Sequence, residues 1–138
     1  MAVRRLFSNY LPAAEVPFGE KKIDLVFVSQ NILNFPVVPD GIDVVSVELK
    51  WKDWRRALKQ ASVNQLCSDR AYVAMPEANF PRDRSPFLKF GVGLIAVNGS
   101  ARVVIESSFR KVTDSRFKRD LIESIVKKLG RQKMVLSR

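Results

Sequence analysis

The chain has 138 residues, 46% of them hydrophobic, which is enough for a single domain over residues 1–138 with a core of ordinary size. One cysteine and no histidine exclude an internal disulfide, zinc sites that mix cysteine and histidine, and every mechanism with a histidine base or nucleophile. Carboxylates and lysines must therefore carry any chemistry.

The formal net charge of +10 is distributed unevenly along the sequence. Residues 1–50 hold 5 Lys/Arg against 6 Asp/Glu, residues 51–108 hold 9 against 5, and residues 109–138 hold 10 against 3. A positive field of this kind attracts polyanions. Nucleic acid is the commonest large one inside the cell, but acidic lipid surfaces and acidic proteins respond to the same sign. The charge therefore leaves the class of partner open.

The sequence predicts neither a membrane span nor a secretory signal. It has no run of about eighteen uncharged apolar residues, and no basic segment followed by an apolar stretch and a small-residue cleavage site. We therefore expect a cytoplasmic protein with no membrane partner.

The first half of the chain is expected to form a helix, two strands and a second helix. Apolar residues at helical spacing predict a short helix over residues 1–10, after which residues 14–18 extend briefly. Runs of β-branched and other apolar residues predict strands over residues 23–29 and 42–50, joined by a loop that contains proline and glycine. A helix over residues 53–67 follows, with an aspartate as its cap.

The second half is expected to add a strand, a hairpin and a last helix. A short strand over residues 71–75 leads into a loop over residues 76–86 that is rich in proline and charge. The segment 91–106 has Asn-Gly between two apolar runs and predicts a β-hairpin. A helix over residues 115–129 stops at a glycine, and a basic tail covers residues 130–138. This order suits a mixed sheet flanked by helices, hence an α/β domain.

The helix over residues 53–67 is expected to have an apolar side and a basic side, and Trp51 and Trp54 are expected to be packing residues. The basic residues are Lys52, Arg55, Arg56 and Lys59. We expect them to contact the phosphates of a nucleic acid, although a solvated helix face explains such a stripe almost equally well. A second phosphate-contacting surface is consistent with the terminal basic cluster, which consists of Arg116, Lys118, Arg119, Lys127, Lys128, Arg131 and Lys133.

Two of the predicted strands carry acidic residues that can meet. Asp24 begins a buried strand, where an ionised group is costly unless it is paired or bound to metal, and Glu48 and Lys50 end the next strand. If these strands are neighbours, the carboxylates of Asp24 and Glu48 converge on one cation, with the backbone carbonyl of Leu49 as a third ligand. Hard oxygen ligands around a site open to water suit Mg²⁺ or Mn²⁺.

Such a site meets the needs of phosphodiester hydrolysis without histidine. A metal lowers the pKa of the attacking water and clamps the phosphate, and the ammonium group of Lys50 stabilises the negative charge of the transition state. Structural salt bridging is the alternative explanation for Asp24, Glu48 and Lys50. Gln60, near the boundary of the two sides of its helix, has either a role in the site or an ordinary surface role.

Asp24, then Glu48-Leu49-Lys50, then a helix with Gln60, resembles the active-site signature of the PD-(D/E)XK nuclease superfamily, which includes restriction endonucleases and archaeal Holliday junction resolvases. The resemblance covers about residues 13–75. It implies that Asp24 and Glu48 are metal ligands, that Lys50 is the catalytic lysine and that Gln60 lies near the metal or the substrate phosphate. It also implies Mg²⁺ as cofactor and a restriction-endonuclease-like three-layer core, with a central mixed sheet between helices.

The residues and the resemblance together predict a metal-dependent endonuclease that acts on DNA and is structure-selective or weakly sequence-specific. A small domain has little room for a separate recognition module, so specificity is expected to come from substrate shape, from the geometry of a homodimer or from a partner protein. Two alternatives stay open. One is a nuclease-like fold without activity that serves nucleic-acid binding or assembly, and the other is a basic scaffold for acidic protein or lipid.

Overall fold

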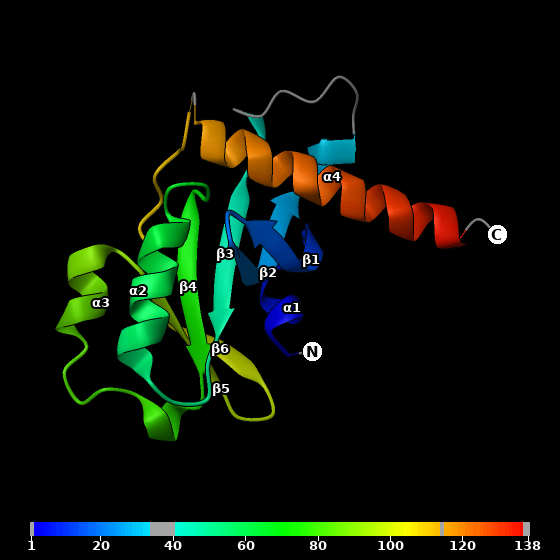
Figure 1. Cartoon of the computed structure of the whole chain (residues 1–138). Coiled ribbons are helices and arrows are strands. Elements are labelled where there is room, and N and C mark those ends of the chain that lie inside the picture. Colours follow the sequence, from blue (N-terminus) through cyan, green and yellow to red (C-terminus); the bar gives the residue numbers. More distant parts are fainter. Residues whose placement is uncertain (1, 34–40, 114, 137–138) are drawn as a thin grey trace.

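The computed structural model describes residues 2–33, 41–113 and 115–136. Over these residues one mixed sheet has the strand order β1-β2-β3-β4-β5-β6 (Figure 1). The strands are β1 (Tyr10–Phe18), β2 (Lys21–Ser29), β3 (Val44–Leu49), β4 (Arg70–Met75), β5 (Gly93–Val97) and β6 (Ala101–Ile105). The helices are α1 (Ala2–Leu6), α2 (Trp54–Asn64), α3 (Ser85–Phe90) and α4 (Arg116–Leu136), with 3-10 turns η1 (Gln30–Leu33) and η3 (Glu77–Asn79). The predicted α/β class with a mixed sheet is confirmed.

The sheet is parallel in its centre and antiparallel toward its edges. β3 pairs with β4 and β4 with β5 in parallel, whereas the β1–β2, β2–β3 and β5–β6 pairs are antiparallel. The helix α2 provides the crossover that two parallel neighbours need. Because β2 and β3 are antiparallel, the carboxyl end of β3 lies next to the amino end of β2. The predicted acidic residues are located at these two strand ends.

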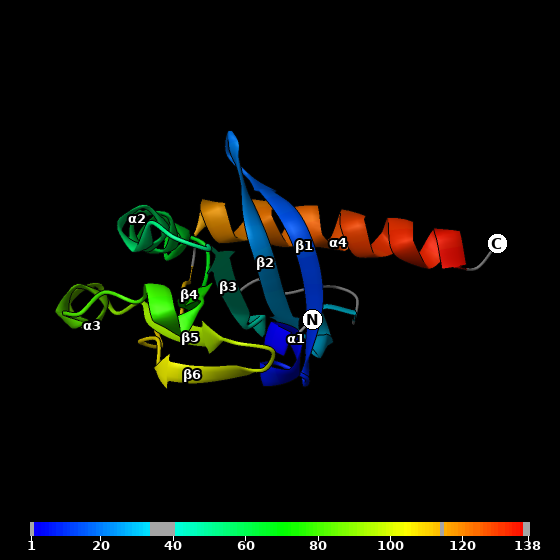
Figure 2. The same ribbon diagram turned by 90° about the horizontal axis from the view of Figure 1, so that it is seen from below.

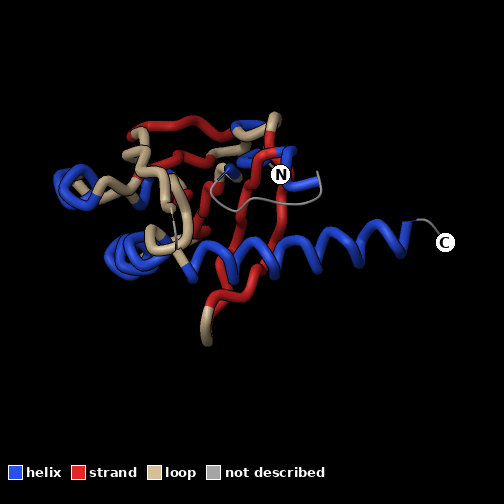
Figure 3. Tube along the Cα trace, turned by 90° about the horizontal axis from the view of Figure 1, so that it is seen from above, coloured by secondary structure: helices blue, strands red, loops and turns tan. Residues whose placement is uncertain are grey.

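Helices cover both faces of the sheet. On one face, α4 packs Ile125 against the cluster that includes Val26, and α2 packs Ala61 against the cluster that includes Val73. On the opposite face, α1 contributes Val3 to a third cluster. Figure 2 shows α1 on the other side of the central strands from α2 and α4, and Figure 3 shows α4 running across the strands of the same sheet. None of the described helices is long and apolar enough to cross a membrane.

The N-terminal helix is shorter than predicted. It ends at Leu6, and Tyr10, expected as its last apolar position, instead begins β1. β1 contains Pro12 and Pro17, which cannot donate to a ladder, and the sheet accommodates them because β1 is an edge strand with β2 on one side only. The predicted extension over residues 14–18 was therefore only the second half of a longer strand.

Later boundaries also differ from the prediction. The loop predicted over residues 76–86 runs into α3, which begins at Ser85 with a proline in its first turn, where the missing N–H costs no hydrogen bond. The helix predicted to stop at Gly130 continues to Leu136, because one glycine inside a helix costs only about 1 kcal/mol. The predicted β-hairpin is confirmed, with Gly99 at a φ angle of 90° in its turn.

A buried ion pair fastens α4 to the sheet. Asp69, just before β4, accepts hydrogen bonds from Nζ of Lys118, at 3.1 Å to each oxygen, and from the backbone N–H groups of Val44 at 2.9 Å and Val112 at 2.7 Å. The side chains of Asp69 and Lys118 are each 1% exposed. The prediction that Lys118 belongs to a phosphate-contacting surface is therefore wrong.

Candidate active site

The register of the sheet brings Asp24 and Glu48 together. Leu25 lies opposite Val47 in the antiparallel β2–β3 pair, so the next residues along, Asp24 and Glu48, face one another on the same side of the sheet. Their carboxyl groups are close enough to share a hydrogen bond and to repel one another when both are ionised. Oδ2 of Asp24 also accepts a hydrogen bond of 2.8 Å from the N–H of Leu49. The two acidic residues predicted as metal ligands are therefore side by side.

Glu48 is buried beneath α2, with 4% of its surface exposed. Its Oε1 atom accepts a hydrogen bond of 2.8 Å from Nδ2 of Asn64, a residue of α2. The pKa of Glu48 is raised to about 7, mainly by burial and further by the charge of Asp24, while Asn64 and Lys50 act in the opposite direction. Near neutral pH this carboxylate therefore exchanges a proton easily, and a cation would compete for it.

The β1–β2 ladder is interrupted beside Asp24. Its paired residues include Ala14 with Leu25 and Val16 with Ile23, but not Glu15 with Asp24 between them. Glu15 adopts a φ angle of 51°, which is unusual for a residue other than glycine and often marks a functional position. Nζ of Lys128 in α4 donates to the backbone carbonyls of Ala14 and Glu15. Lys128 thus supports this irregular backbone, and the phosphate-contacting role predicted for it stays a prediction.

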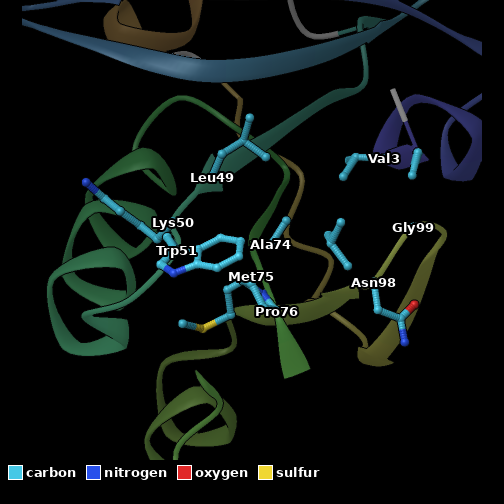
Figure 4. A pocket seen from close by; sticks show the side chains of 11 residues that line it. Val3, Leu49, Lys50, Trp51, Ala74, Met75, Pro76, Asn98 and Gly99 are labelled. Atoms are coloured by element: carbon cyan, nitrogen blue, oxygen red, sulfur yellow. The ribbon is translucent and has the colours of Figure 1, made fainter. Parts of the chain in front are cut away.

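Lys50 and Trp51 leave the end of β3 in opposite directions. The N–H of Lys50 pairs with the carbonyl of Ala74 in β4 at 3.0 Å, and its side chain extends toward α2 while the indole of Trp51 lies on the other side (Figure 4). The charge of Lys50 is near enough to lower the pKa of Glu48. Trp51 is 72% exposed, so the packing role predicted for it is wrong, whereas Trp54 packs on Phe87 with ring centroids 6.0 Å apart.

Gln60 lies in the same cavity as Glu48. This cavity, of about 270 Å³, is also lined by Glu20, from the turn between β1 and β2, and by Asn64. Oε1 of Gln60 is buried and has no hydrogen-bond partner among the described residues. An unpaired buried oxygen is costly, so Oε1 of Gln60 is available to a cation or a water molecule in this cavity.

A basic groove adjoins this cavity. The second cavity, of about 420 Å³, is lined by Arg56 and Lys59 of α2 and shares Lys21, Lys22, Gln60 and Val63 with the first. Arg56 and Lys59 belong to the predicted basic stripe. Its other members, Lys52 and Arg55, are exposed at the start of α2, where the guanidinium of Arg55 lies 4.6 Å from the ring centre of Trp54. Lys21 and Lys22 were not among the predicted site residues, although two adjacent lysines just before Asp24 were a visible signal in the sequence.

The donor set fits a hard divalent cation. No group of three or more His, Cys, Asp or Glu side chains comes together within the described ranges, so neutral oxygens would have to complete any coordination shell. The N–H of Leu49 points to Asp24, and its carbonyl lies on the same side of β3 because both groups of a strand residue face the same neighbour. Asp24, Glu48, the Leu49 carbonyl and Oε1 of Gln60 therefore offer oxygen atoms only, as Mg²⁺ and Mn²⁺ prefer.

Comparison with known proteins identifies a protein of similar fold whose function is unknown. No protein-family model matches the sequence, and no curated protein matches it significantly. A solved structure of a protein of unknown function from Silicibacter pomeroyi has a similar fold, with a TM-score of 0.70 and 16% sequence identity over 99% of this chain and 86% of that chain. At this identity the likeness concerns the fold alone.

Proposed function

We propose that the protein is a divalent-metal-dependent nuclease that hydrolyses DNA phosphodiester bonds on a restriction-endonuclease-like fold. The observation that carries the proposal is the convergence of the Asp24 and Glu48 carboxylates beside Lys50. A mixed sheet with helices on both faces is the architecture that the resemblance implied. The arrangement also resembles that signature in its order, because an acid of one strand meets an acid and a lysine of the next.

Each residue of the site has a distinct role in this proposal. Asp24, Glu48 and the Leu49 carbonyl would hold Mg²⁺ or Mn²⁺, which when bound lowers the pKa of a water molecule and neutralises charge on the phosphate. The ammonium of Lys50, within the field of Glu48, stabilises negative charge on the phosphate and orients the attacking water. Asn64 holds the Glu48 carboxylate by its 2.8 Å hydrogen bond and is a positioning residue.

The basic groove supplies the path for the substrate backbone. Lys21, Lys22, Arg56 and Lys59 come from two different elements and line one cavity, and this cavity meets the acidic one at Gln60. Positive side chains on both walls of a groove attract and align a polyanion, whereas a solvated helix face needs no second wall. A nucleic-acid backbone in this groove would be led toward the carboxylates of Asp24 and Glu48.

A second candidate function is nucleic-acid binding without cleavage, on the same fold. It is favoured by the fact that both carboxylates have protein donors, from the N–H of Leu49 to Asp24 and from Asn64 to Glu48. Carboxylates that only stabilise the fold would have their hydrogen-bond donors within the protein in this way. This candidate predicts salt-dependent binding to DNA and no turnover with any metal.

Cleavage assays with Mg²⁺ or Mn²⁺ separate the two candidates. Labelled linear duplex, single-stranded, nicked, flapped and four-way branched DNA would be incubated with the wild type and with Asp24→Asn, Glu48→Gln and Glu123→Gln variants. Glu123 is exposed on α4, so Glu123→Gln matches the chemical change away from the site. We expect the wild type and Glu123→Gln to cut at least one substrate, and EDTA and the two site variants to abolish cutting. Binding without cutting would reject the nuclease in favour of the binding module.

A further inference from the structure

A large apolar pocket opens beside Lys50 on the other side of the strand end from the acid pair. It has a volume of about 660 Å³, within the range of about 300–1,000 Å³ that is common for small-molecule sites. Figure 4 shows the ring of Trp51 on one side of it, Val3 of α1 and Asn98 of the β5–β6 turn on the opposite side, and Met75 below. Apart from Lys50 and Asn98, its lining side chains are apolar.

The pocket is continuous with the proposed active site along the backbone. Lys50 lines it, and the next residue, Trp51, presents its ring to it. Consecutive Cα atoms are about 3.8 Å apart, so a nucleic-acid strand that passes the end of β3 would meet Lys50 on one side of it and the ring of Trp51 on the other. Lys50 is the charged residue of the lining, and Lys52 and Arg55, which follow in the chain, are exposed and positively charged. A ligand that fits this surface therefore combines an apolar part with an anionic part.

Trp51 is exposed but its backbone is held in place. The carbonyl of Trp51 accepts a hydrogen bond from Nδ2 of Asn79, in η3. Two residues later Asp53 adopts a φ angle of 61° and caps α2, with its carboxylate accepting the N–H of Arg56 at 3.2 Å. An aromatic side chain that is 72% exposed on a fixed backbone can bind a ligand with little loss of conformational freedom.

We propose that this pocket receives an unstacked nucleobase of the strand whose phosphate lies at Lys50, so that the protein prefers nucleic acid with unpaired nucleotides next to the cleavage site. The inference rests on the proposed function, because that function places the phosphate at Lys50. Tryptophan is a stacking surface for any base, and the carboxamide of Asn98 offers both a donor and an acceptor to a base edge. A purely apolar segment of a partner protein would leave the charge of Lys50 without a counterpart.

Binding to abasic DNA tests this proposal. In EDTA, the wild type would be titrated with a blunt duplex, with the same duplex carrying a single-stranded flap, and with a flap whose sugars lack bases. We expect the flap to bind about 5-fold or more tightly than the abasic flap, since stacking of one base on an aromatic ring has about this effect or more. Trp51→Ala should remove this difference, Trp51→Phe should keep part of it, and Phe90→Ala, at an exposed aromatic of α3, should leave it intact.

The outcomes separate the pocket from the nuclease. Equal binding of the flap and the abasic flap by the wild type, or an undiminished difference in Trp51→Ala, would overturn the base pocket even if Glu48-dependent cleavage is found. A difference that depends on Trp51, without cleavage, would support the pocket and overturn the hydrolysis. If instead the wild type sediments as a dimer that Trp51→Ala dissociates, with no effect of the bases, the pocket is a contact between two copies and the proposal is wrong.

Discussion

Two buried carboxylates next to the central strands, Asp69 and Glu48, differ in how their charge is compensated. Asp69 is 3% exposed and meets the ammonium of Lys118 and two backbone N–H groups. Glu48 is 4% exposed but faces a second carboxylate, that of Asp24, and has one carboxamide as donor. The two carboxylates are thus buried to a similar degree, but a positive charge stabilises ionised Asp69 whereas a negative charge destabilises ionised Glu48. A compensated buried charge indicates a structural role, and an uncompensated one indicates a site for a ligand.

The same contrast separates stability from function in the fold. The Asp69–Lys118 pair joins the segment before β4 to α4 and therefore holds the α4 layer against the sheet. The Asp24–Glu48 pair makes like charges converge, which lowers stability unless a proton or a cation is bound. Proteins tolerate such losses at functional sites. The following substitutions test whether the two pairs differ in this way.

Removal of Lys118 is expected to have the largest effect on stability. In Lys118→Met, Asp69 keeps its burial and loses its only ammonium partner among the described side chains, so the free energy of unfolding should fall by about 3–5 kcal/mol. Arg102→Met is the control, because Arg102 pairs with Glu77 where the two side chains are 58% and 43% exposed, and its loss should cost under about 1 kcal/mol. Urea denaturation measures both values, and equal small losses would show that the buried pair is not structural.

Glu48→Gln is expected to stabilise the protein at alkaline pH. The pKa of Glu48 is about 7 in the folded state, against an ordinary value of 4.5. Ionised Glu48 therefore lowers the free energy of unfolding, and this loss is complete above pH 7. As pH falls from 7 toward 4.5 the folded protein takes up the proton and this loss disappears. The variant should therefore gain about 3 kcal/mol at pH 8 and nothing near pH 4.5 in urea denaturation. A variant less stable than the wild type at pH 8 would make Glu48 structural, like Asp69.

The basic groove should give a smaller, salt-dependent effect. Replacing Lys21 and Lys22 with glutamine removes two charges from one wall of the groove, so affinity for duplex DNA should fall. The slope of log K against log salt should decrease by about 0.9 for each phosphate that the protein no longer neutralises. Lys89→Gln with Lys127→Gln removes two exposed charges outside the groove and is the control. If both double variants change the slope equally, overall charge rather than the groove guides the DNA.

The central strands and the β5–β6 hairpin could be predicted from the sequence, whereas the edge strand β1 could be predicted only in part. Residues 23–29, 42–50 and 71–75 are apolar runs whose pattern is local, and each proved to be a strand near its predicted bounds. β1 was half missed because its prolines are compatible with a strand only at a sheet edge, which is a tertiary property. α3 was missed because proline was interpreted as a loop signal although it also suits the first turn of a helix.

Part of the candidate site could likewise be predicted from the sequence and part could not. The meeting of Asp24 and Glu48 could be anticipated, since alternation along each strand and pairing of neighbours suffice to predict it. The contact of Asn64 with Glu48 could not, because it depends on how α2 packs over β3. The same is true of Lys21 and Lys22, whose place opposite Arg56 follows from the position of the β1–β2 turn next to α2.

Titration of Mn²⁺ by calorimetry at pH 8 tests the central claim most directly. The proteins would be the wild type, Glu48→Gln and, as the matched control, Glu123→Gln. We expect one ion to bind the wild type and the control, with an affinity that falls at pH 6 because Glu48 must lose its proton. Binding should be lost in Glu48→Gln. An unchanged affinity in Glu48→Gln, or no binding by the wild type, would contradict the assignment of the Asp24–Glu48 pair as a metal site.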